Sequence, residues 1–169
     1  LPGKGDYGGI TLNLAAKQYA DAWSPGPDEA AGQACKAYGA GALLRIPGRL
    51  HITWQDDDTL KVQTDAGQQT RLLRFNAPAA DAVPPPSLQG LSVASWIVPA
   101  PPRGPAPAPA AKAAGPPPFG TLKVVTTDML PGYLRKNGVP YSDQMTMVEY
   151  WDLRRASDGS QWLTITTEL

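Results

Sequence analysis

Hydrophobic residues recur at helical spacing only near the start of the chain. Thr11 is a potential N-cap, and the pattern ends at 24–27, the sequence Ser-Pro-Gly-Pro. The apolar positions that carry the pattern are Leu12, Ala15, Ala16, Tyr19 and Trp23. The spacing predicts one helix before residue 24. A second helical turn is expected within 28–37, because Pro27 suits a helix start and acidic residues follow it.

The period changes to two from residue 49 onward. Leu50, Ile52 and Trp54 share one face of a predicted strand, and polar residues alternate with them on the other face. Alternating segments bounded by turn residues continue along the chain. They predict seven strands, at 49–55, 60–64, 69–75, 88–98, 121–127, 145–152 and 161–167.

This order of elements predicts an all-β fold. We expect a small antiparallel β-barrel of about seven to eight strands with one N-terminal helix, lipocalin-like by analogy, because closure removes exposed strand edges. A β-sandwich is the alternative. The single domain would span 1–169, with a loose glycine-containing leader at 1–10. Residues 99–118 are almost entirely Pro, Ala and Gly, which predicts an exposed insertion that pairs with no strand.

Composition narrows the function classes. Fifteen Lys and Arg balance fifteen Asp and Glu, so no net charge favours nucleic-acid binding. No run reaches the ~20 apolar residues of a membrane-spanning helix. Cys35 is the single cysteine, which excludes an internal disulfide and a multi-cysteine metal site. The chain starts at Leu1 rather than at methionine, as expected after signal-peptide cleavage or for part of a longer chain.

Glu149 and Arg71 are the most informative charged residues. Glu149 shares a predicted strand face with Met147 and Trp151, and Arg71 shares one with Leu73. Burying an unpaired carboxylate costs several kcal/mol, so a partner is required. One interpretation is an ion pair between Glu149 and Arg71 inside the barrel. The other is that they line a cavity, with Glu149 as a general acid or base or with Arg71 holding an anionic ligand.

The remaining titratable residues allow a functional and a structural interpretation. His51 lies on the polar face of the first strand, so it is a surface residue unless a wet barrel interior faces it. In that case His51 is a candidate catalytic proton-transfer group. Asp56, Asp57 and Asp58 occupy a turn, where solvated carboxylates are more common than a calcium site. Common phosphate-, zinc- and dinucleotide-binding motifs are absent, so we expect neither a metal nor a cofactor.

Two further groups are candidate ligand contacts. The segment 131–141 places two phenols, a guanidinium and an amide between turn residues, and its candidates are Tyr133, Arg135, Asn137 and Tyr141. They either contact a ligand at the barrel mouth or hold their own loop through hydrogen bonds. The second group consists of aromatic residues, although large aromatic side chains more commonly fill barrel interiors: Trp54, Trp96 and Trp151.

Two sequence blocks suggest a family. The segment 120–142, GTLKVVTTDMLPGYLRKNGVPYS, and the segment 47–54, PGRLHITW, resemble blocks of a widespread family of exported bacterial proteins of unknown function. The resemblance implies export to the periplasm or the medium. It brings no catalytic residues.

Three function hypotheses follow. The first is a non-catalytic protein that binds a small, largely apolar or amphipathic molecule in a barrel cavity, with polar contacts from Arg71, Tyr133 and Arg135. The second is a cofactor-independent isomerase, lyase or hydrolase that uses Glu149 or His51, which requires Glu149 to face a cavity without a salt bridge. The third is an interaction module whose proline-rich segment binds a protein partner.

Overall fold

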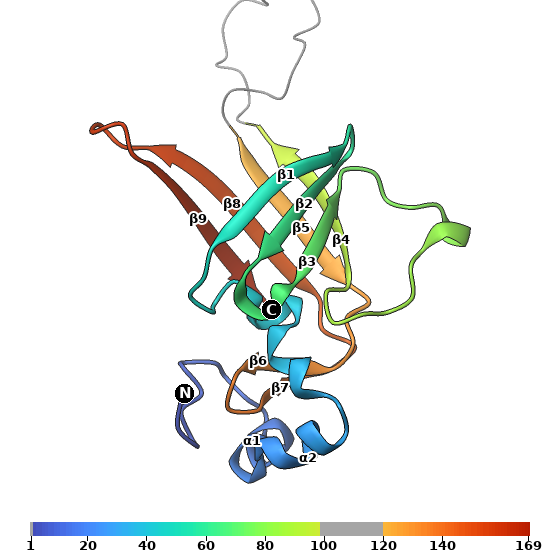
Figure 1. The fold of residues 1–169 in the computed structure, drawn as a ribbon, viewed down its shortest axis with the longest axis vertical. Helices are drawn as coiled ribbons and strands as arrows, with labels where there is room; N and C mark the ends of the chain where they lie inside the picture. The colour runs from blue at the N-terminus through green and yellow to red at the C-terminus, as the bar shows by residue number, and fades with distance from the viewer. Residues whose placement is uncertain (1, 99–119) are drawn as a thin grey trace, which may run out of the picture.

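The computed structural model describes residues 2–98 and 120–169. Seven strands form one sheet in the order β1-β2-β3-β4-β5-β8-β9 (Figure 1). They are β1 (Leu50–Asp56), β2 (Thr59–Thr64), β3 (Thr70–Arg74), β4 (Leu91–Ile97), β5 (Thr121–Thr127), β8 (Met147–Arg155) and β9 (Gln161–Glu168). Each of the seven predicted strands is therefore confirmed as an element, and the fold is mostly β.

Strand pairing departs from a simple meander at one place. Antiparallel hydrogen bonding joins neighbouring strands except at β3 and β4, which are parallel, with Leu73 beside Ser92. A parallel neighbour needs a crossover, and residues 75–90 supply it with the 3-10 turn η3 (Ala80–Ala82). The antiparallel arrangement that we expected therefore does not hold between β3 and β4.

The sheet curls into a half-barrel, which Figure 1 shows as a cone that widens toward the β1–β2 turn. Within the described residues β1 and β9 are its unpaired edges, so these strands do not form the closed ring that we expected. Strand alternation places the core side chains on the concave side. That core consists of Val62, Leu73, Ala94, Leu122, Val124 and Trp151.

A smaller layer lies beneath the narrow end of the sheet (Figure 1). It contains a two-stranded hairpin and short helices: β6 (Gly132–Arg135), β7 (Val139–Tyr141), α1 (Leu14–Ala22), α2 (Pro25–Ala30), η1 (Ala34–Tyr38) and α3 (Ala40–Leu43), with η2 (Ala66–Gln68) close to η1. The helix predicted before residue 24 is confirmed as α1. Its N-cap is Asn13 rather than Thr11, because the Asn13 side chain accepts a hydrogen bond from the Ala16 amide at 2.8 Å.

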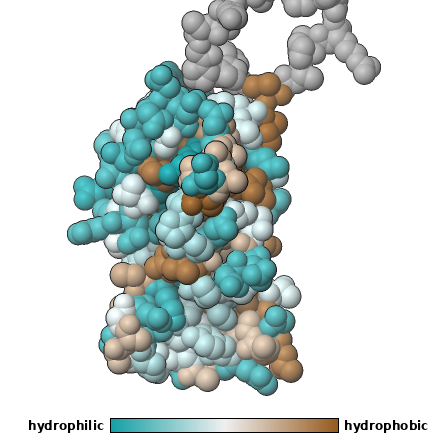
Figure 2. All heavy atoms as spheres, turned by 90° about the vertical axis from the view of Figure 1, so that its right-hand side faces the viewer, coloured by the Kyte–Doolittle hydropathy of each residue, from teal (hydrophilic) through white to brown (hydrophobic). Residues whose placement is uncertain are grey.

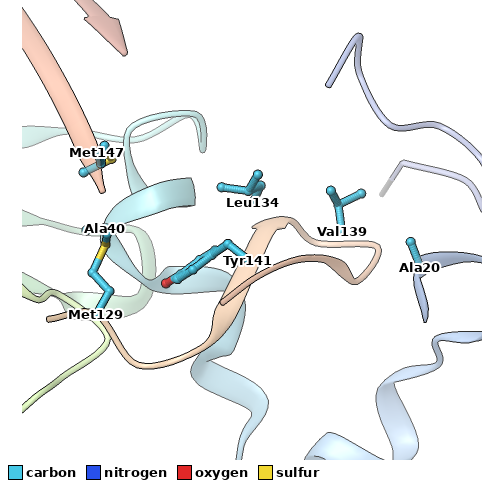
Figure 3. Close-up of a cluster of buried hydrophobic side chains, with 7 residues drawn as sticks. All are labelled: Ala20, Ala40, Met129, Leu134, Val139, Tyr141 and Met147. Atoms are coloured by element: carbon cyan, nitrogen blue, oxygen red, sulfur yellow. The ribbon is translucent and has the colours of Figure 1, made fainter. Parts of the chain in front are cut away.

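A second apolar cluster joins this layer to the sheet (Figure 3). Met129 and Met147 come from the sheet side, Ala40 comes from α3 and Ala20 comes from α1. Side chains of the β6–β7 hairpin fill the space between them. The hairpin and the helices therefore form a layer that packs against the narrow end of the sheet.

The N-terminal segment is held by contacts, in contrast to the loose leader expected for 1–10. The Asn137 amide donates to the carbonyl oxygens of Gly3 and Asp6 at 2.8 and 2.9 Å, and Arg135 forms an ion pair with Asp6. The expected insertion at 99–118 lies outside the described residues. In the described ranges, no helix has the length and apolarity needed to cross a membrane.

Candidate functional site

A buried ion pair crosses the concave side of the sheet. Arg71 on β3 donates to the two carboxylate oxygens of Glu149 on β8, from Nη1 at 3.2 Å and from Nη2 at 2.7 Å. The same Nη2 lies 3.2 Å from the hydroxyls of Ser92 and Thr126, on the two intervening strands. Arg71 and Glu149 are each 1% exposed, so each buried charge has the other as its countercharge.

This geometry confirms the ion-pair interpretation of the two residues. Glu149 does not face a cavity with a free carboxylate, so the condition that the enzyme hypothesis placed on it is not met. Arg71 has its charge neutralised by Glu149 and is not positioned to hold an anionic ligand. The pair and the apolar core occupy the middle of the concave side, and the two concave hollows found among the described residues lie toward its ends.

One hollow lies at the wide end of the concave side, over the β1–β2 turn. It has a volume of about 480 Å³ and is lined by Trp54, Phe75, Trp96 and the three acidic turn residues 56–58. The three rings form a row, with centroids 5.5 Å apart for Trp54 and Phe75 and 5.9 Å apart for Phe75 and Trp96. Trp54 is 51% exposed and Trp96 is 38% exposed, so much of this aromatic surface faces solvent.

A second hollow lies where the two sheet edges approach each other. It has a volume of about 420 Å³ and runs between Leu50 on β1 and Leu163 and Ile165 on β9, with 43–49 forming one wall. Leu50 and Leu163 are exposed. They are on the concave side because Leu50 faces Thr64 and Leu163 faces Leu153 in the strand registers. An unclosed sheet therefore leaves an apolar seam open to solvent.

A larger hollow, about 860 Å³, is a groove between α1 and the β6–β7 hairpin. Tyr133 and Lys36 line it, but their polar groups are already engaged by Asp28. The Asp28 carboxylate accepts from Tyr133 Oη at 2.5 Å, Trp23 Nε1 at 2.8 Å and Lys36 Nζ at 3.2 Å. This groove thus offers a ligand few unoccupied polar groups on that side.

The Asp28 cluster has a definite protonation state. Burial by itself would raise the pKa of the Asp28 carboxyl, but the hydrogen bonds from Tyr133, Trp23 and Lys36 outweigh it and lower that pKa below the ordinary value. Burial and the bond to Asp28 raise the pKa of Tyr133 far above its usual range. Asp28 is therefore a carboxylate and Tyr133 a neutral phenol at physiological pH.

The 131–141 segment, which contains β6 and β7, lies at the narrow end (Figure 1), whereas the aromatic hollow lies over the β1–β2 turn. Tyr133 binds Asp28, Arg135 binds Asp6, and Asn137 binds the backbone of the N-terminal segment. These contacts fit the second interpretation, in which hydrogen bonds hold the segment in place, and Asn137 and Gly138 turn a hairpin that packs under the sheet. Tyr133 and Tyr141 still line the groove beside α1.

Tyr141 is a buried phenol without a hydrogen-bond partner among the described residues. Its hydroxyl is confined by Gly39 and Gly132, since a Cβ at either glycine would lie 2.5 or 2.6 Å from it. Figure 3 shows the ring directed from β7 toward the side of the cluster that holds Met129 and Ala40. Burial raises the pKa of Tyr141 to about 12.

The other candidates separate by position. His51 is exposed and points away from the concave side, because its neighbours Leu50 and Ile52 face inward. Trp151 is buried in the core, as expected for a barrel aromatic, whereas Trp54 and Trp96 are not. Across the described ranges, no three His, Cys, Asp or Glu side chains converge in a way that could hold a metal ion.

Comparisons with protein-family models, with curated proteins and with solved structures found no match to this chain.

Phe75 is the site residue that sequence reasoning did not single out as a ligand contact. It follows the last residue of β3 and has the same parity as Arg71 and Leu73, so its face was predictable. Its place between Trp54 and Trp96 depends on the curl of the sheet, which the alternation pattern does not encode.

Proposed function

We propose that this protein binds a small, largely apolar or amphipathic molecule on the concave side of its half-barrel. The observation that carries the proposal is the exposed apolar surface at the open end and the seam, where a folded chain ordinarily hides such residues. It includes Leu50, Ile52, Trp54, Trp96, Leu153 and Leu163.

The dimensions support a ligand of modest size. The two concave hollows, about 480 and 420 Å³, fall within the roughly 300–1,000 Å³ typical of small-molecule sites. The ligand would lie at the mouth and along the seam, because the core and the ion pair of Arg71 and Glu149 occupy the middle. This placement replaces the deep barrel cavity of the sequence-based hypothesis.

Export to the periplasm or the medium stays a prediction from the family resemblance. The interaction-module hypothesis concerns 99–118, outside the described residues, and no described contact bears on it. The enzyme hypothesis lacks a suitable carboxylate at Glu149, and His51 lies on the other face of the sheet. Ligand binding is therefore the function that the described residues support best.

Native mass spectrometry of the protein purified from its own host tests the proposal directly. We expect a small apolar or amphipathic compound to travel with the protein and to be released on denaturation. Titration calorimetry with decyl maltoside, below its micelle concentration, supplies a defined probe. Saturable binding to one or two sites is the expected result, and failure of both measurements would refute the proposal.

Two tryptophan variants locate the site. Trp54→Ala should weaken decyl maltoside binding by about tenfold, because a large apolar contact is removed. Trp162→Ala is the matched control, since Trp162 is 66% exposed but belongs to the opposite face of β9, where it pairs with Arg154. Equal effects of the two variants would place the ligand elsewhere.

A further inference from the structure

The hollow formed by Trp54, Phe75, Trp96 and 56–58 combines two features that the rest of the concave side lacks. It offers the π surfaces of three aromatic rings, and it has three acidic side chains at its edge. We propose that this hollow binds the cationic head group of a free amphipathic small molecule, a trimethylammonium or similar organic amine. The inference rests on the proposed function and names the ligand class for the same site.

The aromatic row is the surface of the hollow that a cationic head group would contact. The neighbouring rings are inclined to each other by 33° and 27°, and Phe75 stacks on Trp96, so the three side chains form one aromatic row across β1, the end of β3 and β4. A cation over such faces is attracted by the ring quadrupoles, most strongly over tryptophan. Trp54 and Trp96 are the two outer members of the row, and both are exposed, so part of each ring is accessible to a ligand.

Three acidic side chains lie at the edge of the hollow. Within the described residues, Asp56, Asp57 and Asp58 form no ion pair, whereas the acidic residues of the lower layer are largely matched by Lys or Arg. Asp56 has a local role, since its side chain accepts from the Asp58 amide at 3.0 Å. The carboxylates of Asp57 and Asp58 accept no hydrogen bond in the described ranges. Their negative charge beside exposed rings complements a cation and repels an anion.

The position of the hollow fits an amphipathic molecule. The aromatic row continues into the apolar core through Phe75, which packs against it, and the apolar side chain of Ile52 lies next to Trp54 on the concave face of β1. A head group held at the rim would therefore direct an attached hydrocarbon chain along exposed apolar surface. A sugar head group could stack on the rings, but it would gain nothing from the uncompensated charge.

Three probes with the same chain length test the head-group preference by titration calorimetry below their micelle concentrations. They are decyltrimethylammonium, decyl maltoside and decyl sulfate. We expect the cation to bind at least about tenfold more tightly than the other two at low ionic strength, and the advantage to shrink as added salt screens the charges. Equal affinity of the three probes, or tightest binding of the maltoside or the sulfate, would overturn the inference.

Variants separate the two contributions. Trp54→Leu keeps an apolar side chain but removes the π surface. It should weaken the binding of the cationic probe by about 3- to 30-fold and the binding of decyl maltoside by much less. The double variant Asp57→Asn/Asp58→Asn should weaken only the binding of the cationic probe, by roughly fivefold at low ionic strength. Asp81→Asn/Glu168→Gln makes the same change in net charge at exposed positions outside the hollow and should leave all three affinities unchanged.

The outcomes distinguish the two proposals. If all three probes bind and Trp54→Leu weakens their binding equally, the inference of a cationic head group is refuted, while the proposal of an apolar site is supported. Binding of none of them would refute both proposals. A circular dichroism spectrum matched to the parent protein checks that each variant is folded.

Discussion

Arg71 and Glu149 are 78 positions apart in the chain and form a two-pronged ion pair across β4 and β5. Strands lie about 4.8 Å apart, so three spacings in a flat sheet would separate β3 and β8 by about 14 Å. Curling of the sheet shortens the distance between β3 and β8 across the concave side. The ion pair and the curl of the sheet therefore depend on each other.

Breaking this pair from one side should be costly. Glu149→Gln leaves the Arg71 guanidinium buried without a countercharge, so we expect the free energy of unfolding to fall by about 3–5 kcal/mol. The double variant Arg71→Met/Glu149→Leu removes both charges and should be destabilised much less than the sum of the single variants. Urea unfolding of the parent, Arg71→Met, Glu149→Leu and the double variant gives the coupling energy, and additive effects of the two changes would contradict the pairing.

Asp28 should make the protein sensitive to acid. Its pKa in the folded state is lower than the ~3.9 of an unfolded aspartate, so its stabilising contribution is present above about pH 4 and is lost as the pH falls through the folded-state value. Asp28→Asn should cost about 2–3 kcal/mol at neutral pH. The stability difference between the parent and this variant should shrink toward pH 3 or so. Asp143→Asn, at an exposed position, is the control, and a constant difference across this pH range would refute the assignment.

Tyr141 should make the stability of the protein depend on pH at the alkaline end of the range. Its folded pKa of about 12 exceeds the ordinary value of 10.0, so its contribution is present below pH ~10 and is lost as the pH rises toward the folded value. Tyr141→Phe removes this dependence. At neutral pH we expect the variant to match the parent or exceed it by up to about 1 kcal/mol, because the hydroxyl has no described partner. A clear loss of stability on thermal unfolding would reveal a hydrogen bond that the hydroxyl makes.

Gly138 lies where the β6–β7 hairpin packs against Trp23, at the end of α1. It has φ of +81°, and a Cβ there would lie 2.1 Å from the Trp23 ring. Gly159 has a similar φ of +86° but open space around it, so Gly159→Ala measures backbone strain alone, about 1 kcal/mol. We expect Gly138→Ala to cost at least about 2 kcal/mol more, because the ring must move. If denaturant unfolding gives equal losses of unfolding free energy for the two variants, the Trp23 ring moves aside without a cost in stability.

The chain's own pattern was sufficient for the local elements. Period-two alternation identified seven strands and the inward faces of Arg71 and Glu149, because side-chain direction along a strand depends only on parity. An ion pair between them followed from the energetic cost of burying either charge alone. The hairpin at 132–141 was missed because its strands are only four and three residues long and contain Gly and Pro, so they carry no alternation.

What the sequence determined by itself is therefore which segments are strands and which side chains face inward. The tertiary structure decided which strands are neighbours, that β3 and β4 run parallel, and that β1 and β9 are left as open edges. It also decided that Trp54, Phe75 and Trp96 form one row while Tyr133 meets Asp28 at the opposite end. Parity fixes the face of each strand, but the partner of each strand depends on contacts between distant segments, which no local pattern encodes.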